Sequence, residues 1–380
     1  MIVFFVGTAA ELVKMAPVIR ETKRRGRAFT VVASGQNDLR GSELWSLANV
    51  HGADVTLSTE RIPPHALGLA SFLARTGATA TSKLRNALGG VSPARAKAVV
   101  HGDTVSTLLG SLLFHRLGVP VHHVEAGLRS FDPLEPFPEE ICRVLVSRLA
   151  SVAYCPNVWA SGHLHRHGLR KVLTHGNTLY DSLALALATE DVAAPAVPFD
   201  ERFFVLVVHR QENLLRGMFL RRIVEKVRAV RERPRCVFIM HALTKAALER
   251  EGLLGELERD PSFLLLPRQP YIAFSKLLAR ADYLVTDGGS NQEEAYYLGL
   301  PCLLMRKVTE RIEGLGSNVL LSRDPVTEIE PFMRVPSRWA RPCVRLSESP
   351  SAIVADDLAD GRRQDAVHPE WAAAEGLARP

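Results

Sequence analysis

The most informative part of the sequence is Tyr283-Leu284-Val285-Thr286-Asp287-Gly288-Gly289-Ser290-Asn291-Gln292-Glu293-Glu294. An apolar run passes here through small residues into a helical pattern. A strand that turns in this way into a helix leaves backbone N–H groups unpaired at the helix start, where the helix dipole is positive. The stretch predicts a phosphate or diphosphate site, in which Gly288 and Gly289 let the backbone approach the anion and Glu294 can accept from ribose hydroxyls. A purely structural turn uses the same residues, so this stretch alone does not distinguish a phosphate site from such a turn.

Short apolar runs alternate with helical patterns along most of the chain. The runs expected as strands are Ile2–Val6, Phe29–Val32, Ala98–Val100, Val121–Val124, Val152–Tyr154, Val172–Thr174, Phe203–Val208, Cys236–Met240, Phe263–Leu266, Tyr283–Thr286 and Cys302–Met305. Their continuous hydrophobicity is typical of parallel strands buried on both faces of a sheet. We therefore predict an α/β fold with two doubly wound, Rossmann-like parallel sheets.

The domain boundaries follow from breaks in this pattern. An Ala/Pro-rich stretch at 193–198 predicts a linker between a first domain, 1–190, and a second domain, 198–345. A short helical pattern covers 351–360, and 361–380 is expected to be a loose tail.

The composition is that of an ordinary globular protein. Of its 380 residues 47 % are hydrophobic and 23 % are charged, and the net charge of +6 is mild. No basic–aromatic pattern predicts nucleic-acid binding, and no apolar run reaches membrane-spanning length. The cysteines, at positions 142, 155, 236, 302 and 343, are too widely spaced for a zinc site or a disulfide framework, which favours the cytoplasm. We interpret His163, His165 and His167 as exposed histidines at a helix end and expect no metal.

Polar residues gather just after the predicted strands, where ligands bind in α/β sheets. From the first domain they are Gly7-Thr8, Glu11, Lys14, His101-Gly102-Asp103-Thr104, Glu125 to Arg129 and Pro138 to Arg143. From the second they are His209 to Asn213, His241, Asp287–Glu294 and Thr309-Glu310-Arg311. Each alone can be a helix cap, a partner of the helix dipole or half of an ion pair. Acids, a lysine and a histidine at corresponding strand ends of two domains favour a shared active site.

The order of these blocks resembles one known family. The blocks are Gly7-Thr8-x-x-Glu11-x-x-Lys14-Met15-Ala16-Pro17-Val18, Gly35-Gln36, His101-Gly102-Asp103-Thr104, Val124-Glu125-Ala126-Gly127-Leu128-Arg129, Pro136-Phe137-Pro138-Glu139-Glu140-x-x-Arg143, Gly176-Asn177-Thr178-x-x-Asp181, His209-Arg210-x-Glu212-Asn213, Thr286–Glu294 and Thr309-Glu310-Arg311. From residue 1 to about 321 the chain resembles the UDP-N-acetylglucosamine 2-epimerases, chiefly the non-hydrolysing bacterial branch. The resemblance implies two domains of the GT-B type, an active site in the interdomain cleft, a final segment that crosses back to the first domain, and a homodimer.

The resemblance also implies a reaction that needs no cofactor. The family removes the C2 proton of UDP-GlcNAc, expels UDP to form 2-acetamidoglucal, and adds UDP back to give UDP-ManNAc. Acid/base groups on both faces of C2 and stabilisation of the departing diphosphate are then required. By resemblance the acid/base candidates are Asp103, Glu125 and Glu139. The candidates for binding UDP or the sugar are His209, which we also count as catalytic, with Arg143, Lys14, Arg210, Arg311, Glu294 and the backbone of Gly288, Gly289 and Ser290.

Some positions depart from the family pattern. Ala9 and Ala10 stand where the family has Arg and Pro, so one diphosphate-binding cation is missing. Asn37 follows Gln36 where a histidine is usual, in a neighbourhood that takes part in activation by a second substrate molecule, so Gln36 is only a possible regulatory residue. Three alternatives stay open: a hydrolysing epimerase that releases ManNAc and UDP, a GT-B glycosyltransferase, and a non-catalytic UDP-sugar binder.

Overall fold

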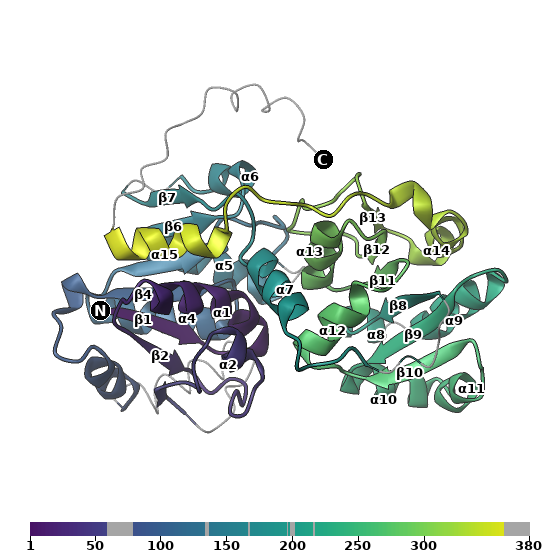
Figure 1. The fold of residues 1–380 in the computed structure, drawn as a ribbon, viewed down its shortest axis with the longest axis horizontal. Coiled ribbons are helices and arrows are strands. Elements are labelled where there is room, and N and C mark those ends of the chain that lie inside the picture. The colour runs from purple at the N-terminus through teal and green to yellow at the C-terminus, as the bar shows by residue number, and fades with distance from the viewer. Residues whose placement is uncertain are drawn as a thin grey trace.

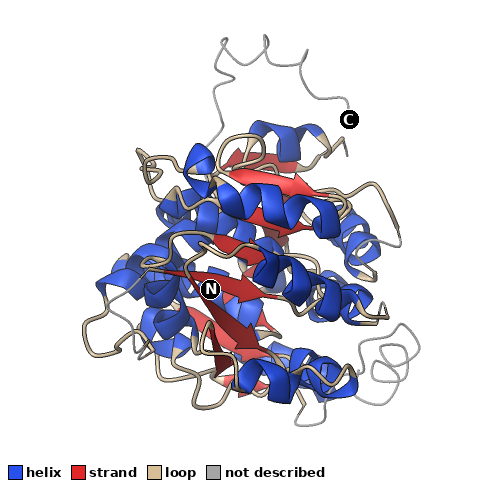
Figure 2. Cartoon of the chain, turned by 90° about the vertical axis from the view of Figure 1, so that its right-hand side faces the viewer, coloured by secondary structure: helices blue, strands red, loops and turns tan. Residues whose placement is uncertain are grey.

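Two parallel β-sheets, each flanked by helices, form the protein in a computed structural model (Figure 1). The structure describes residues 1–58, 79–133, 137–165, 168–195, 197, 202–215 and 217–360. The expected tail at 361–380 lies outside them, as does part of the expected linker. Figure 2 shows the strands lying between layers of helices. The predicted α/β class is confirmed.

The first sheet has the strand order β3-β2-β1-β4-β5-β6-β7. Its strands are β1 (Ile2–Val6), β2 (Phe29–Ala33), β3 (Val55–Thr56), β4 (Lys97–His101), β5 (Val121–Val124), β6 (Val152–Cys155) and β7 (Arg170–Leu173). Its helices include α1 (Ala9–Arg24), α2 (Leu44–Leu47), α4 (Val105–Arg116), α5 (Glu139–Leu149), α6 (Val158–Gly162) and α7 (Leu179–Ala188). The chain order reverses direction between β1 and β4, which makes their carboxyl ends the place where a ligand is expected.

Strand β1 illustrates why the strands are apolar throughout. Phe4 packs into one hydrophobic cluster, with residues of α1, and Phe5 packs into another, with residues of α4. Successive side chains of a strand point to opposite faces, so a sheet covered on both faces needs apolar residues at every position.

The second sheet has the order β10-β9-β8-β11-β12-β13 and reverses between β8 and β11. Its strands are β8 (Phe203–Val207), β9 (Arg235–Met240), β10 (Phe263–Pro267), β11 (Leu284–Thr286), β12 (Cys302–Met305) and β13 (Val319–Ser322). Its helices are α8 (Gln211–Leu214), α9 (Phe219–Ala229), α10 (Ala242–Arg250), α11 (Leu254–Glu258), α12 (Tyr271–Leu278), α13 (Gly289–Leu298) and α14 (Pro325–Arg334). The apolar run before Asp287 and the helical pattern after Gly288 are β11 and α13, on one side of the reversal.

The last described helix, α15 (Pro350–Asp360), lies against α1 in the first half of the molecule (Figure 1). Asp357 on α15 is fully buried and forms two bonds of 2.6 Å to the guanidinium of Arg170. Tyr154 donates to the same carboxylate at 2.8 Å. Lys97 donates to the carbonyl of Leu358 at 2.6 Å, at the last turn of α15. These contacts attach α15 to the starts of β4 and β7 and to β6.

Asp357→Asn is expected to lower the free energy of unfolding by about 3 kcal/mol, the low end for breaking a buried ion pair, because Arg170 is 30 % exposed on its side chain. Urea unfolding near pH 7 measures this. Burial opposes ionisation of Asp357, but Arg170 and Tyr154 outweigh it and lower its pKa. The contribution is therefore present above the ordinary carboxyl pKa and lost as the pH falls.

Asp360→Asn is the matched control on the same helix, since its carboxylate is 70 % exposed and pairs with Arg27 at 3.1 Å. Exposed pairs contribute little, so this variant should unfold as the wild type does. Equal stability of the two variants would contradict the role given to Asp357.

Candidate active site

The carboxyl ends of the two sheets face each other through polar contacts between the domains. Lys14 on α1 lies 3.1 Å from Glu293 on α13. Arg311, from the segment after β12, lies 3.0 Å from Glu125, which follows β5. The hydroxyl of Tyr297 accepts from the backbone N–H of Asn177 at 2.8 Å. The strand ends that the sequence singles out in each domain therefore meet at one boundary.

Glu125 occupies the centre of this boundary and is buried. Its backbone has a φ of 62°, a left-handed conformation that carries strain in a non-glycine residue and is common at functional sites. The carboxylate accepts from Lys14, from Asn177 Nδ2 and from Arg311. Burial opposes ionisation, but the charges of Lys14 and Arg311 outweigh it and hold the pKa of Glu125 well below its usual value. Glu125 is therefore a carboxylate at neutral pH.

Asp103 and Glu140 are joined by one buried arginine. Arg143 on α5 is 1 % exposed, and its guanidinium contacts Asp103 and, at 2.5 Å, Glu140. Glu140 also accepts from Arg129 and from the backbone N–H of Ser130. The guanidinium of Arg143 thus positions the carboxylate of Asp103, whereas Glu140, to which the sequence assigns no role, fixes Arg143.

Glu139 has the opposite electrostatic environment. It opens α5 and is partly buried, and its Oε2 atom is buried without a hydrogen-bond partner among the described residues. Burial and the negative charge of Asp103 raise its pKa. A boundary that holds one carboxylate firmly ionised and another that binds a proton more readily can supply both a base and an acid.

His209 is oriented by Asp287, at the carboxyl ends of β8 and β11. Its Nδ1 atom lies 3.3 Å from an oxygen of the fully buried Asp287, and its ring stacks on that of His241 at 4.8 Å. Asp287 also accepts from the backbone N–H groups of His209 and Arg210, both at 3.0 Å. Burial lowers the pKa of His209, although Asp287 opposes this. His209 is a sequence-predicted residue; its dependence on Asp287 is not visible in the sequence.

The start of α13 faces His209 and two arginines. A Cβ atom added to Gly288 would lie 2.9 Å from the ring of His209, and one added to Gly289 would lie 2.9 Å from Arg311 and 3.3 Å from Arg306. A side chain at either position would have to displace these groups. Unpaired N–H groups at a helix start together with these cations make this a candidate site for an anion. The sequence prediction names Arg311 here but not Arg306.

Comparison with known proteins now identifies the family. A family model described as UDP-N-acetylglucosamine 2-epimerase matches residues 69–329, more than half of the chain. The chain belongs to this family. The family resemblance of the sequence blocks is thereby confirmed.

Individual relatives of the epimerase family match most of the chain. A UDP-N-acetylglucosamine 2-epimerase of Methanococcus maripaludis is 29 % identical over 353 residues, which cover 88 % of this chain and 92 % of the relative. A UDP-2,3-diacetamido-2,3-dideoxy-D-glucuronate 2-epimerase of Pseudomonas aeruginosa is 33 % identical over 241 residues, or 61 % of this chain and 66 % of the relative. The crystal structure of the Methanocaldococcus jannaschii UDP-GlcNAc 2-epimerase in complex with UDP-GlcNAc and UDP has a TM-score of 0.77 at 25 % identity, covering 94 % of this chain and 99 % of that one. The predicted GT-B type is confirmed.

Two candidates of this epimerase-family chain make local contacts instead of facing an open space. Glu294 is 2 % exposed and accepts from Asn291 at 2.8 Å, and burial raises its pKa to about 7. Gln36 accepts from the backbone N–H of Ser106 at 3.1 Å, at the start of α4. Asn37, its neighbour, accepts from the N–H of Ala9 at 3.2 Å, at the start of α1. Gln36 and Asn37 thus hold the loops after β1 and β4.

Arg210 and Ser290 are the remaining candidates. Arg210 pairs with Glu212 at 2.9 Å, and its backbone N–H is bound by Asp287. Ser290 is the second residue of α13 and is partly exposed. Of the histidines predicted to be exposed, His165 is exposed, whereas His163 is half-buried with Nδ1 2.8 Å from the carbonyl of Gly127; position 167 lies outside the described residues.

No group of histidines, cysteines and acids in the described ranges is arranged to hold a metal ion. No helix within the same ranges has both the length and the apolar character needed to cross a membrane.

Proposed function

We propose that this chain epimerises UDP-GlcNAc to UDP-ManNAc at C2, by elimination of UDP and its re-addition to 2-acetamidoglucal. Two carboxyl groups with opposite tendencies support this, Glu125 ionised and Glu139 with a raised pKa, at a boundary where His209 and Arg311 lie close to the start of α13. UDP-GlcNAc is proposed as the substrate because the relatives are UDP-GlcNAc 2-epimerases.

The proposed reaction divides its work between the two domains. A carboxylate of the first domain, Glu125 or Asp103, takes the proton from C2, and a protonated carboxyl on the other face, for which Glu139 is suited, returns one. The start of α13, His209 and Arg311 stabilise the negative charge that develops on UDP as the bond to C1 breaks. Because Arg311 pairs with both Glu125 and Glu293 of α13, each at 3.0 Å, it links the leaving group to the base.

Proton NMR of the purified protein with UDP-GlcNAc tests the proposal. UDP-ManNAc, free ManNAc and unchanged UDP-GlcNAc have distinct anomeric signals. We expect signals of UDP-ManNAc to grow to a constant ratio. Unchanged substrate would contradict the proposal.

Hydrolysis is the second candidate, and one observation favours it. Ala9 and Ala10 open α1 where the family has Arg and Pro, so a cation for the diphosphate is missing. Loosely held UDP would leave before it adds back, and free ManNAc would accumulate. Arg306 and Arg311 at Gly289 favour compensation of the missing charge.

Ala9→Arg distinguishes these two outcomes. With compensation, we expect the dissociation constant of UDP, measured by calorimetry, and the product ratio to change little. Loose holding predicts instead a gain of about 1.5–3 kcal/mol, the value of a charge-assisted hydrogen bond, together with more UDP-ManNAc. Ala10→Arg, one position along and exposed, controls for general attraction by an added charge.

A further inference from the structure

A buried carboxyl group with no part in the reaction described so far lies at the reversal of the first sheet. Glu11 stands in the first turn of α1 and is 2 % exposed. It accepts from the backbone N–H of Gly7 at 2.7 Å and from the hydroxyl of Thr104 at 2.5 Å. The hydroxyl of Thr8 is a third donor, at 3.2 Å. Gly7 and Thr8 follow β1 and Thr104 follows β4, so one side chain ties together the loops after both strands.

Helix capping alone does not account for this carboxyl group. Thr8 and Glu11 have the spacing of a capping box, in which the acid serves its own helix. The hydroxyl of Thr8 already caps α1 by accepting from the N–H of Glu11 at 3.2 Å, and the hydroxyl of Thr104 caps α4. Glu11 instead joins the two caps to each other. Burying a carboxyl group costs free energy unless it is hydrogen-bonded, so its place here indicates a role beyond the caps.

The loop after β4 carries Asp103 between two held residues. The carbonyl of Gly102, just before Asp103, lies 2.7 Å from Nε2 of the fully buried His123. Thr104, just after Asp103, donates its hydroxyl to Glu11. The backbone is therefore held on both sides of Asp103, and the hold after it comes from α1.

The charge of Glu11 depends on its surroundings. Burial raises the pKa of Glu11 to about 7; the three donors oppose this rise, and the charge of Asp103 adds to it. Above that pH Glu11 is a carboxylate that can accept from all three donors. Lys14, one turn further along α1, contacts Glu125, so the helix that carries Glu11 also carries a partner of the proposed base.

We propose, on the basis of the function proposed above, that Glu11 is a positioning residue for the reaction at C2. Through Thr104 it fixes the backbone of Asp103, one of the carboxyl groups that can serve as acid or base there. A displacement of about 1 Å in a catalytic group can lower the rate by about 10²-fold. Loss of the link from Glu11 to Thr104 therefore lowers turnover.

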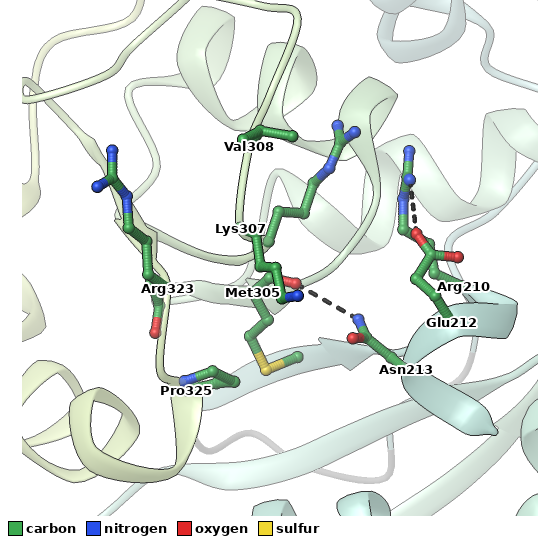
Figure 3. A pocket seen from close by; sticks show the side chains of 10 residues that line it. Arg210, Glu212, Asn213, Met305, Lys307, Val308, Arg323 and Pro325 are labelled. Carbon is green, nitrogen blue, oxygen red and sulfur yellow. Dashed lines mark hydrogen bonds and ion pairs between the residues drawn. The ribbon is translucent and has the colours of Figure 1, made fainter. Parts of the chain in front are cut away.

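In the proposed reaction UDP is held by the second domain, at the start of α13. Arg210, a further candidate for binding UDP, lies beside Glu212 in a pocket after β8 (Figure 3). The bonds of Glu11 go to the loops after β1 and β4 in the first domain. A loss of turnover with unchanged UDP affinity is therefore the mark of a positioning role, whereas a disturbed fold would affect both.

Substitutions at both ends of the link test this role. Turnover and the Michaelis constant are measured as consumption of UDP-GlcNAc at pH 8, where Glu11 is mostly ionised. The variants are Glu11→Gln, Thr104→Val, Thr104→Ser and the double variant with Glu11→Gln and Thr104→Val. Serine keeps the hydroxyl that donates to Glu11 and caps α4, and valine removes it. Calorimetry gives the dissociation constant of UDP, and melting temperatures show that each variant is folded.

Two controls remove similar groups from the same helices. Glu21→Gln removes a carboxylate of α1 that pairs with Arg24 at 3.0 Å. Ser111→Ala removes a buried hydroxyl of α4 that donates to the carbonyl of Thr107 at 2.8 Å, within the same helix. Both controls should turn over substrate as the wild type does.

We expect Glu11→Gln and Thr104→Val each to lower turnover by about 10–10²-fold, with little change in the Michaelis constant or the dissociation constant of UDP. Thr104→Ser should be nearly as active as the wild type. The double variant should be no slower than the slower single variant, because both substitutions break the same link. Unchanged turnover in Glu11→Gln, losses that multiply in the double variant, or a Thr104→Ser variant as slow as Thr104→Val would overturn the positioning role.

Failure of the proposed function is seen separately. A wild type that consumes no UDP-GlcNAc contradicts that function, whereas an active wild type with an equally active Glu11→Gln contradicts the positioning role alone. If Glu11→Gln does not fold, the comparison of Thr104→Val with Thr104→Ser decides.

Discussion

Replacing Glu125 with glutamine is expected to lower turnover by about 10²–10⁴-fold, the usual contribution of a general acid or base. The amide keeps the size of the side chain but cannot take a proton, and it loses the charge that Lys14 and Arg311 contact. Glu139→Gln and Asp103→Asn should have effects of the same order. UDP affinity should change much less, because these side chains belong to the first domain and face the sugar in the proposed reaction.

The pH profile separates the two glutamates. If Glu139 acts as the acid, turnover falls as the pH rises through its raised pKa, and Glu139→Gln removes that limb. The pKa of Glu125 is held low, so its own limb lies at more acidic pH. Glu225→Gln, an exposed glutamate on α9, is the control and should be fully active. Near-normal turnover in two of the three acid variants would refute the assignment.

The second large effect is expected at Asp287. This carboxylate accepts from the backbone of His209 and Arg210 and from Asn213 Nδ2 at 3.1 Å, besides facing the His209 ring. In Asp287→Asn an amide group must face these donors, so the loop loses bonds and His209 loses its orientation. We expect turnover to fall by about 10²-fold, the low end for an acid/base group, and UDP affinity to fall with it.

A structural and a positioning role of Asp287 can be told apart. UDP dissociation constants and melting temperatures are measured for Asp287→Asn and for a control, Asp282→Asn. Asp282 lies just before β11, and its carboxylate pairs with the exposed Arg202. The account predicts weaker UDP binding only in Asp287→Asn, at a temperature where both variants are folded. Weak binding in a protein that is also unfolded at the assay temperature would indicate a structural role. Unchanged UDP binding would remove His209 from the diphosphate.

The sequence predicts the frame of this molecule well because buried parallel strands need apolar runs. It misses two edge strands, Val55–Thr56, which has only two residues, and Val319–Ser322. At β7 it places the strand at 172–174, whereas the strand runs Arg170–Leu173, because an edge strand tolerates polar residues such as Arg170.

The candidate site is predicted as a set of residues but not as a set of contacts. Positions after strands could be named because the carboxyl ends of parallel strands share an edge. Asp287 orients His209, which lies 78 residues away in the sequence. This contact arises because β8 and β11 are neighbours in the sheet, and the sequence alone does not show the strand order. The same holds for Arg306, whose approach to Gly289 requires β11 and β12 to be neighbours.

If carboxyl groups at the domain boundary exchange the proton on C2, deuterium from the solvent must enter the product at that carbon. The protein is incubated with UDP-GlcNAc in D₂O, and the products are followed by proton NMR and mass spectrometry. The account predicts UDP-ManNAc that carries deuterium at C2, with labelled UDP-GlcNAc forming on the return, and neither in Glu125→Gln at comparable times. Epimer formed with hydrogen retained at C2 would contradict the claim.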